Sequence, residues 1–193
     1  MNNSEKKTDL RIQKTLSALT GALKELMCEK DIESITVKEI CDKAQTRKAT
    51  FYNHFTDKND LLAYTIRSQM QLSEEEGSVY DDPDDPAQYY IQILLYLMEF
   101  LQKNEKMMSR IIKGPDTIVG EIYKEEMEPV FYERLKKEQK NGNEAVKLPG
   151  MLSGVMSEVI IQSAWYWFMH TDSISRQEAA DQIKVLTDAL FKA

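Results

Sequence analysis

Apolar residues recur at helical spacing along most of this chain. Over 8–27 they fall three or four positions apart, with basic residues between them: Ile12, Leu16, Leu19, Leu23 and Leu26. This spacing predicts an amphipathic helix of about five turns. β-Branched residues dominate no run, and the chain holds only 7 glycines and 5 prolines. The pattern therefore favours an all-α fold.

Two short helices are predicted after the break at residues 28–35. Thr36 and Glu39 have the spacing of a capping box, which marks the start of a helix over 37–44. That helix is expected to bury Val37, Ile40, Cys41 and Ala44. A three-residue connection, 45–47, leads to a second short helix over 48–55, which is expected to bury Ala49, Phe51 and Phe55.

Longer helices follow. Asp57 and Asp60 suit the start of a helix that carries Leu61, Leu62 and Ile66. The stretch GSVYDDPDDP, 77–86, is predicted to be a linker, because it lacks the ligand spacing of a calcium loop. Asp85 is expected to cap the next helix. The remaining predicted helices are 86–103, 104–113, 115–140 with a kink at Pro129, 149–171, and 175–191 behind a Ser175–Glu178 capping box.

Charge divides the chain unevenly. Of 193 residues with a net charge of −7, residues 1–67 hold 12 basic and 10 acidic side chains, net +2. Residues 68–193 hold 13 basic and 22 acidic side chains, net −9. The acidity therefore belongs to the C-terminal part and does not exclude an anionic partner for the N-terminal part.

Several classes of protein are not supported by the sequence. The N-terminus lacks the apolar stretch of a signal peptide, and the most apolar segment, 159–169, is too short to cross a bilayer, so we expect a cytoplasmic protein without a membrane partner. Cys28 and Cys41 form no CxxC pair and are expected to be buried thiols. No GxSxG, HExxH or phosphate-binding loop occurs. We therefore expect no catalytic residues, metal or cofactor.

The helices at 8–27, 37–44 and 48–55 have the form of a helix-turn-helix. In that unit the second helix of the pair enters the DNA major groove, while the first crosses the phosphate backbone. Four cations lie within 43–58 against one acid, Asp57: Lys43, Arg47, Lys48 and Lys58. Such local cations can neutralise phosphates. Lys48, Thr50, Tyr52, Asn53 and His54 would remain on the outer face of the reading helix for DNA contacts.

The segment ITVKEICDKAQTRKATFYNHFTDKNDLL, 35–62, resembles the DNA-binding domain of the TetR family of bacterial transcription regulators. Nine positions match that pattern in register: Thr36, Ile40, Ala44, Thr50, Tyr52, His54, Phe55, Lys58 and Leu61. The resemblance implies base or groove contacts from Lys38, Lys48, Ala49, Thr50 and His54, and phosphate contacts from Thr46, Tyr52 and Lys58. His54 could instead be a partly buried helix residue.

Two positions depart from the family pattern. The turn glycine is replaced by Gln45, and a non-glycine residue with positive φ costs on the order of 1 kcal/mol. The serine at the start of the reading helix is replaced by Arg47, which adds a cation that can seek phosphate. Both changes lie at residues that set the orientation of the reading helix, so they affect which base each residue contacts.

Apolar and aromatic side chains of the C-terminal part could line an effector cavity: Tyr90, Leu94, Met98, Met107, Ile111, Tyr123, Met127, Phe131, Trp165 and Trp167. An ordinary helical core or a dimer interface explains them equally well. The last two helices also carry small residues that allow close packing, which suits the four-helix homodimer interface usual in the family. The segment 165–183 resembles a Firmicutes-type branch, some members of which activate transcription or respond to a protein partner.

Together these features predict an all-α chain with a helix-turn-helix DNA-binding domain at 1–67 and an effector-binding and dimerisation domain at 68–193. We expect a TetR-like regulator that binds double-stranded operator DNA as a homodimer and is a repressor released by a small-molecule or protein effector. The alternatives are an activator, or a partner-controlled interaction module with the same fold.

Overall fold

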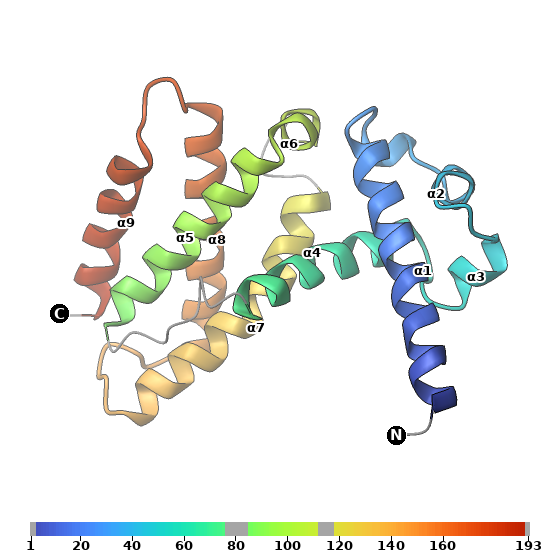
Figure 1. Cartoon of the computed structure of the whole chain (residues 1–193). Helices are drawn as coiled ribbons and strands as arrows, with labels where there is room; N and C mark the ends of the chain where they lie inside the picture. Colours follow the sequence, from blue (N-terminus) through green and yellow to red (C-terminus); the bar gives the residue numbers. More distant parts are fainter. Residues whose placement is uncertain (1–2, 76–84, 112–117, 192–193) are drawn as a thin grey trace. The chain divides into compact units, whose positions relative to one another are not determined.

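The computed structural model describes residues 3–75, 85–111 and 118–191, and within these ranges the fold is all-α with no strand. Figure 1 shows the helices in chain order: α1 (Asn3–Met27), the 3₁₀ helix η1 (Ile32–Ser34), α2 (Val37–Lys43), α3 (Lys48–Tyr52), α4 (Lys58–Glu75), α5 (Pro86–Lys103), α6 (Glu105–Ile111), α7 (Ile118–Lys140), α8 (Pro149–Met169) and α9 (Arg176–Phe191). The predicted all-α fold class is confirmed. None of the described helices is long and apolar enough to cross a membrane.

Polar side chains at the predicted helix starts form capping hydrogen bonds. Asp85 accepts a hydrogen bond from the N–H of Ala87 at 2.9 Å and caps α5, as predicted. Glu178 accepts from the N–H of Ser175 at 2.8 Å, which completes the predicted capping box before α9. Asp57 accepts from the N–H groups of Asn59 and Asp60 at the start of α4. Most of the linker predicted at 77–86 lies outside the described residues.

The chain gathers into two compact units. One comprises Met1–Ile66 with Lys106–Ile111, and the other comprises Arg67–Glu105 with Ile112–Ala193. The division along the chain falls within α4. Helix α6 groups with the first unit, although it follows α5 in sequence, and the hydrophobic pattern gave no sign of this.

The second unit is built around α5 and α8. Helix α5 packs against both α8 and α9, and α8 packs against α7. Its core is aromatic at one end of α5, where the ring of Tyr90 lies 5.1 Å from Phe131 and stacks on Phe191 at 5.5 Å between centroids. The predicted face of α5 is buried as expected: Tyr90, Leu94, Leu97 and Leu101.

Candidate nucleic-acid interface

A capping box fixes the start of α2. The N–H of Glu39 donates to the hydroxyl of Thr36 at 3.3 Å, and the Glu39 carboxylate accepts from the N–H of Thr36 at 2.9 Å. The ammonium group of Lys30 also donates to this carboxylate. The hydrogen bonds from Lys30 and then Thr36 lower the pKa of Glu39 to about 2. The predicted cap is confirmed, and it ties α2 to the segment after α1.

The turn between α2 and α3 has the left-handed residue that its length requires. Gln45 has a φ of +52°, and it is the one described non-glycine residue with positive φ. The N–H of the next residue, Thr46, donates to the carbonyl of Cys41 at 2.9 Å, which closes the end of α2. Glutamine therefore occupies a backbone position where glycine is favoured.

The candidate reading helix α3 is shorter than predicted. Its regular part ends at Tyr52, although the N–H of Phe55 still donates to the carbonyl of Phe51 at 2.9 Å. Phe51 is fully buried and Phe55 is 5% exposed, so both anchor the helix as predicted. The expected burial of Ala49 is wrong: its side chain is exposed, because the two phenylalanines alone form the inward face.

Two of the four local cations are held by the protein itself. The ammonium group of Lys43 pairs with Glu29 at 2.9 Å and with Glu25 at 3.2 Å, and these hydrogen bonds raise its pKa. Lys58 donates to three backbone carbonyls, those of Ile32 at 2.7 Å, Glu33 at 2.8 Å and Ile35 at 2.9 Å. All three ammonium hydrogens of Lys58 are therefore used, which argues against its expected phosphate contact.

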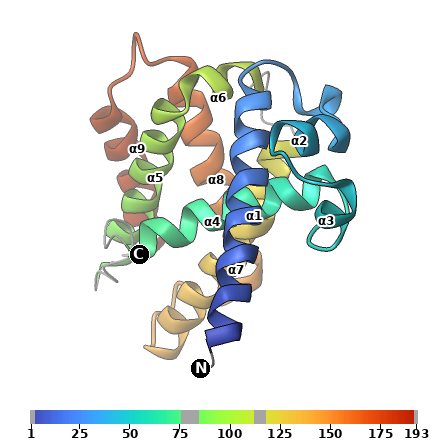
Figure 2. The same ribbon diagram turned by 45° about the vertical axis from the view of Figure 1, so that its right-hand side comes forward.

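The other predicted contact residues form one accessible stretch over α2, the turn and α3. Figures 1 and 2 show α2 and α3 on the same side of α1. Exposed side chains comprise Lys38, Arg47, Lys48, Ala49, Tyr52 and Asn53, whereas those of Thr46, Thr50 and His54 are half-buried. Tyr52 is 57% exposed, and its ring meets Phe51 edge-on at 5.4 Å. This surface presents cations, a hydroxyl and amides, which are the groups that bind phosphates and base edges.

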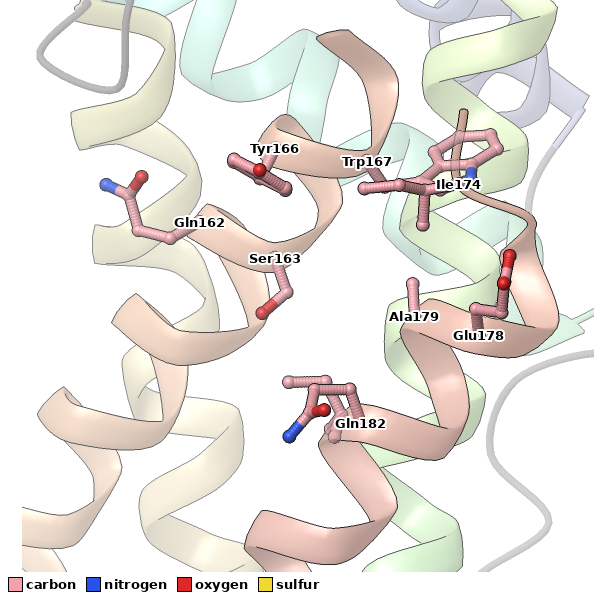
Figure 3. Close-up of a pocket in the computed structure, with 9 residues that line it drawn as sticks. Gln162, Ser163, Tyr166, Trp167, Ile174, Glu178, Ala179 and Gln182 are labelled. Atoms are coloured by element: carbon pink, nitrogen blue, oxygen red, sulfur yellow. The ribbon is translucent and has the colours of Figure 1, made fainter. Parts of the chain in front are cut away.

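The predicted effector residues are divided between the two units. Seven of them are buried in the second unit: Tyr90, Leu94, Met98, Tyr123, Met127, Phe131 and Trp165. Met107 is buried in the first unit, and the side chain of Ile111 lies outside the described residues. A cavity of about 470 Å³ between α8 and α9 (Figure 3) shares only Trp167 with the predicted group. Its other lining residues carry no motif that sequence reasoning could have found.

No group of three or more His, Cys, Asp or Glu side chains in the described ranges is arranged to hold a metal ion. Cys41 is buried and Cys28 is half-buried, and burial raises the pKa of the Cys41 thiol.

The segment that carries this surface is similar to known proteins. Residues 19–65 match the family described as bacterial regulatory proteins, tetR family. An uncharacterized HTH-type transcriptional regulator, YxbF of Bacillus subtilis (strain 168), is 39% identical over 64 residues, which is 33% of this chain. The chain spans only 17% of that protein's length.

The fold is similar over nearly the whole chain to solved structures. A putative TetR-family regulator from Syntrophomonas wolfei superposes with a TM-score of 0.66 at 17% identity, covering 96% of this chain and 97% of that one. RolR in complex with resorcinol superposes with a TM-score of 0.61 at 18% identity, covering 92% and 89%. At these identities the likeness concerns the fold.

Proposed function

We propose that this chain is a TetR-family transcriptional regulator that acts in the cytoplasm as a homodimeric repressor of a pseudo-palindromic operator. The observation that carries the proposal is the exposed surface of α3. Its two phenylalanines fix the helix from inside, and Arg47, Lys48 and Tyr52 face solvent within the segment that matches the family. A helix held in this way can enter the major groove without rearrangement.

We assign the contacts by chemistry. Base or groove contacts fall to Lys38, Lys48, Ala49, Thr50, Asn53 and His54, since lysine can read guanine, asparagine can read adenine and small side chains can touch a thymine methyl. Phosphate contacts fall to Thr46, Arg47 and Tyr52. Lys58 leaves this group, because its ammonium group is held by backbone carbonyls.

An exposed apolar stripe on the last two helices supports dimerisation. Along α8 it comprises Met151, Val155, Tyr166 and Met169, each more than half exposed, and on α9 Val185 is 62% and Leu186 50% exposed. The buried face of α9 is a different one: Ala180, Ile183, Thr187 and Phe191. Contiguous exposed apolar surface of this kind marks a protein interface. A second copy would cover it by forming a four-helix interface.

Release of DNA requires an effector that distinguishes two states of the dimer. A two-fold dimer reads half-sites roughly 34–36 Å apart, so a state with another spacing between its reading helices loses the operator. Near-complete switching needs a difference in effector affinity worth about 5.5 kcal/mol. RolR, which has a similar fold, binds the small molecule resorcinol, which supports a small-molecule effector for this chain.

The test is selection of bound sequences from random duplex DNA with the purified chain at two salt concentrations. We expect enrichment of an inverted repeat, with binding that weakens as salt rises. Weak salt-sensitive binding without enrichment would contradict the proposal and favour the interaction module. Transcription from a promoter that carries the selected repeat then distinguishes a repressor from an activator, because a repressor lowers transcription and an activator raises it.

A further inference from the structure

The first turns of α1 extend beyond the core of their unit. Side chains 10–14 are all exposed, and the first side chain of α1 that the structure describes as buried is that of Leu19. Figures 1 and 2 show the N-terminal end of α1 reaching past α3. Helices in proteins draw most of their stability from packing, so this stretch offers a surface that the fold of its own unit does not use.

Two exposed cations lie on the face of α1 that is turned toward α2. At 3.6 residues per turn, Lys14 lies about 20° and Arg11 about 40° from Glu25 around the helix axis. The carboxylate of Glu25 pairs with the ammonium group of Lys43, at the end of α2, at 3.2 Å. Both ribbon views show α3 nearer than α2 to the N-terminal end of α1. Arg11 and Lys14 therefore continue the exposed surface of α3 along α1.

The charges of this face are available to a partner. Arg11 and Lys14 form no ion pair with a side chain that the structure describes, in contrast to Lys43. Residues 10–18 contain these two cations and no acidic residue, although the net charge of the chain is −7. A local positive surface on an acidic protein attracts a polyanion.

The spacing of the two cations suits the DNA backbone. Arg11 and Lys14 are three residues apart, which corresponds to roughly 4.5 Å of helix rise. Each DNA strand carries one phosphate per about 3.4 Å of helix axis, so two long side chains at this spacing can contact neighbouring phosphates. Arginine and lysine bind phosphate oxygens whatever the base sequence is.

We propose that Arg11 and Lys14 bind the phosphate backbone of DNA next to the groove that α3 enters. The inference rests on the proposed function and adds α1 to the surface formed by α2, the turn and α3. Each copy then holds the operator at two places, through α3 in the major groove and through α1 on the backbone. The contacts of α1 fix the position of the protein on the duplex and carry no sequence information.

The test measures the affinity of the full-length chain at about 50 mM and about 200 mM salt, on the selected operator and on a scrambled duplex. Arg11→Gln or Lys14→Gln removes two phosphate contacts from a dimer, so each should lower the slope of log affinity against log salt by about 1.8. Over this range of salt, each variant should therefore lose about twelvefold less affinity than the wild type loses. The effect should be the same on both duplexes.

Two added cations are the matched controls. Ala18→Lys places a charge about 20° from Glu25 around α1, and it should steepen the salt dependence by about 1.8. Gln13→Lys places the same charge about 120° from Glu25 and should leave the salt dependence unchanged. All four substituted positions are exposed, so thermal unfolding should give melting temperatures close to that of the wild type.

Uncharged methylphosphonate groups in the operator locate the contacts. We expect a position in each half-site at which the neutral group weakens binding of the wild type severalfold. The same group should leave binding of the double variant Arg11→Gln/Lys14→Gln unchanged, because that variant has already lost the contact.

The outcomes separate this inference from the proposed function. An operator that wild type, Arg11→Gln and Lys14→Gln bind with the same salt dependence would overturn the backbone contact of α1 and leave the proposed function intact. A wild type that binds no operator would refute the proposed function, and the contact of α1 with it.

Two further results would also overturn the inference. Equal steepening by Ala18→Lys and Gln13→Lys would show attraction of DNA at long range without a defined contact. A shift from dimer to monomer in the sedimentation of Lys14→Gln would show that this face binds a second copy of the chain instead of DNA.

Discussion

One ammonium group joins η1 to the start of α4. Lys58 donates to the carbonyls of Ile32, Glu33 and Ile35 from a distance of 23 to 26 residues along the chain. These carbonyls belong to η1 and the residue after it, and the carbonyl of Ile32 also accepts from the N–H of Ile35 at 3.1 Å. Lys58 therefore acts as a structural clamp in the first unit. We expect its loss to lower stability more than it lowers DNA affinity.

We expect Lys58→Met to lower the free energy of unfolding by about 1–3 kcal/mol, because three carbonyls lose a charged donor. Urea unfolding followed by circular dichroism measures the change. The control is Lys48→Met, the same substitution at an exposed lysine of α3, for which we expect a change within about 0.5 kcal/mol. Equal effects of the two substitutions would contradict the clamp.

Gln45 holds a left-handed backbone conformation with φ of +52°. Gln45→Gly should stabilise the protein by up to about 1 kcal/mol, since relief of the steric cost exceeds the added flexibility of the unfolded chain. The matched control is Gln13→Gly at an exposed position inside α1, which should destabilise by about 1 kcal/mol. Thermal unfolding of both variants measures these changes in stability. If Gln45→Gly lowers the stability, the backbone strain at this position is absent.

Glu39 makes the first unit sensitive to acid. Its pKa is lowered to about 2 by hydrogen bonds from Lys30 and Thr36. A lowered pKa means that the charged carboxylate contributes stability above the unfolded value near 4.5, and that this contribution is lost as the pH falls toward 2. We expect Glu39→Gln to be less stable than wild type at pH 7 and to lose less stability between pH 5 and pH 2, roughly the window set by these pKa values.

The measurement is urea unfolding at intervals across that window. Glu33→Gln, at an exposed glutamate of η1, is the control and should follow the wild-type curve in slope. Parallel curves for wild type and Glu39→Gln would contradict the role of this carboxylate.

At the scale of elements, the helices with explicit caps were the easiest to predict. The range 86–103 agrees with α5 because Asp85 and Pro86 mark its start, and Ser175 with Glu178 located α9 to within one residue. Helix α3 was predicted three residues too long, because Asn53 and His54 carry no stop signal. Its end is marked by local backbone hydrogen bonds, from Asn53 to Ala49 and from His54 to Phe51, which the hydrophobic pattern does not encode.

The exposed surface of α2 and α3 was predictable from the sequence because its residues are contiguous, whereas the partners of its cations were not. Lys43 looked like any exposed lysine, but Glu25 and Glu29 on α1 lie close enough to neutralise it. The cavity between α8 and α9 likewise depends on which faces of two helices meet, and the residues that line it form no sequence motif.

The exposed stripe on α8 and α9 gives a prediction for assembly. Leu186→Glu places a charge on a side chain that is 50% exposed and that we assign to the dimer interface. We expect the variant to sediment as a folded monomer at micromolar concentrations where the wild type is a dimer, because a charge buried in an interface is costly. Ile12→Glu on α1, where the side chain is 40% exposed, is the matched control and should remain dimeric. A dimeric Leu186→Glu would place the interface elsewhere.

At the scale of the whole molecule, an acidic protein binds a polyanion only if its cations are concentrated and free. The net charge of −7 comes from residues 68–193, and within the first unit Lys43 and Lys58 are engaged by protein groups. Arg47 and Lys48 are the exposed cations at the start of α3. Binding should therefore depend on few phosphate contacts for each copy, and losing one of them should be visible in the dependence on salt.

Salt dependence separates the roles of these cations. Each phosphate contact contributes about 0.9 to the slope of log affinity against log salt, so Arg47→Ala, which removes two contacts from a dimer, should reduce the slope by about 1.8 and weaken every duplex alike. Lys43→Ala should leave the slope unchanged, since its charge is already paired with Glu29 and Glu25. Lys48→Ala should instead relax sequence preference at one position of each half-site.

Fluorescence anisotropy on the selected operator and a scrambled duplex at several salt concentrations measures all three effects. A slope that falls with Lys43→Ala, but not with Arg47→Ala, would mean that the ion pair opens on DNA and that α2 makes the main backbone contact.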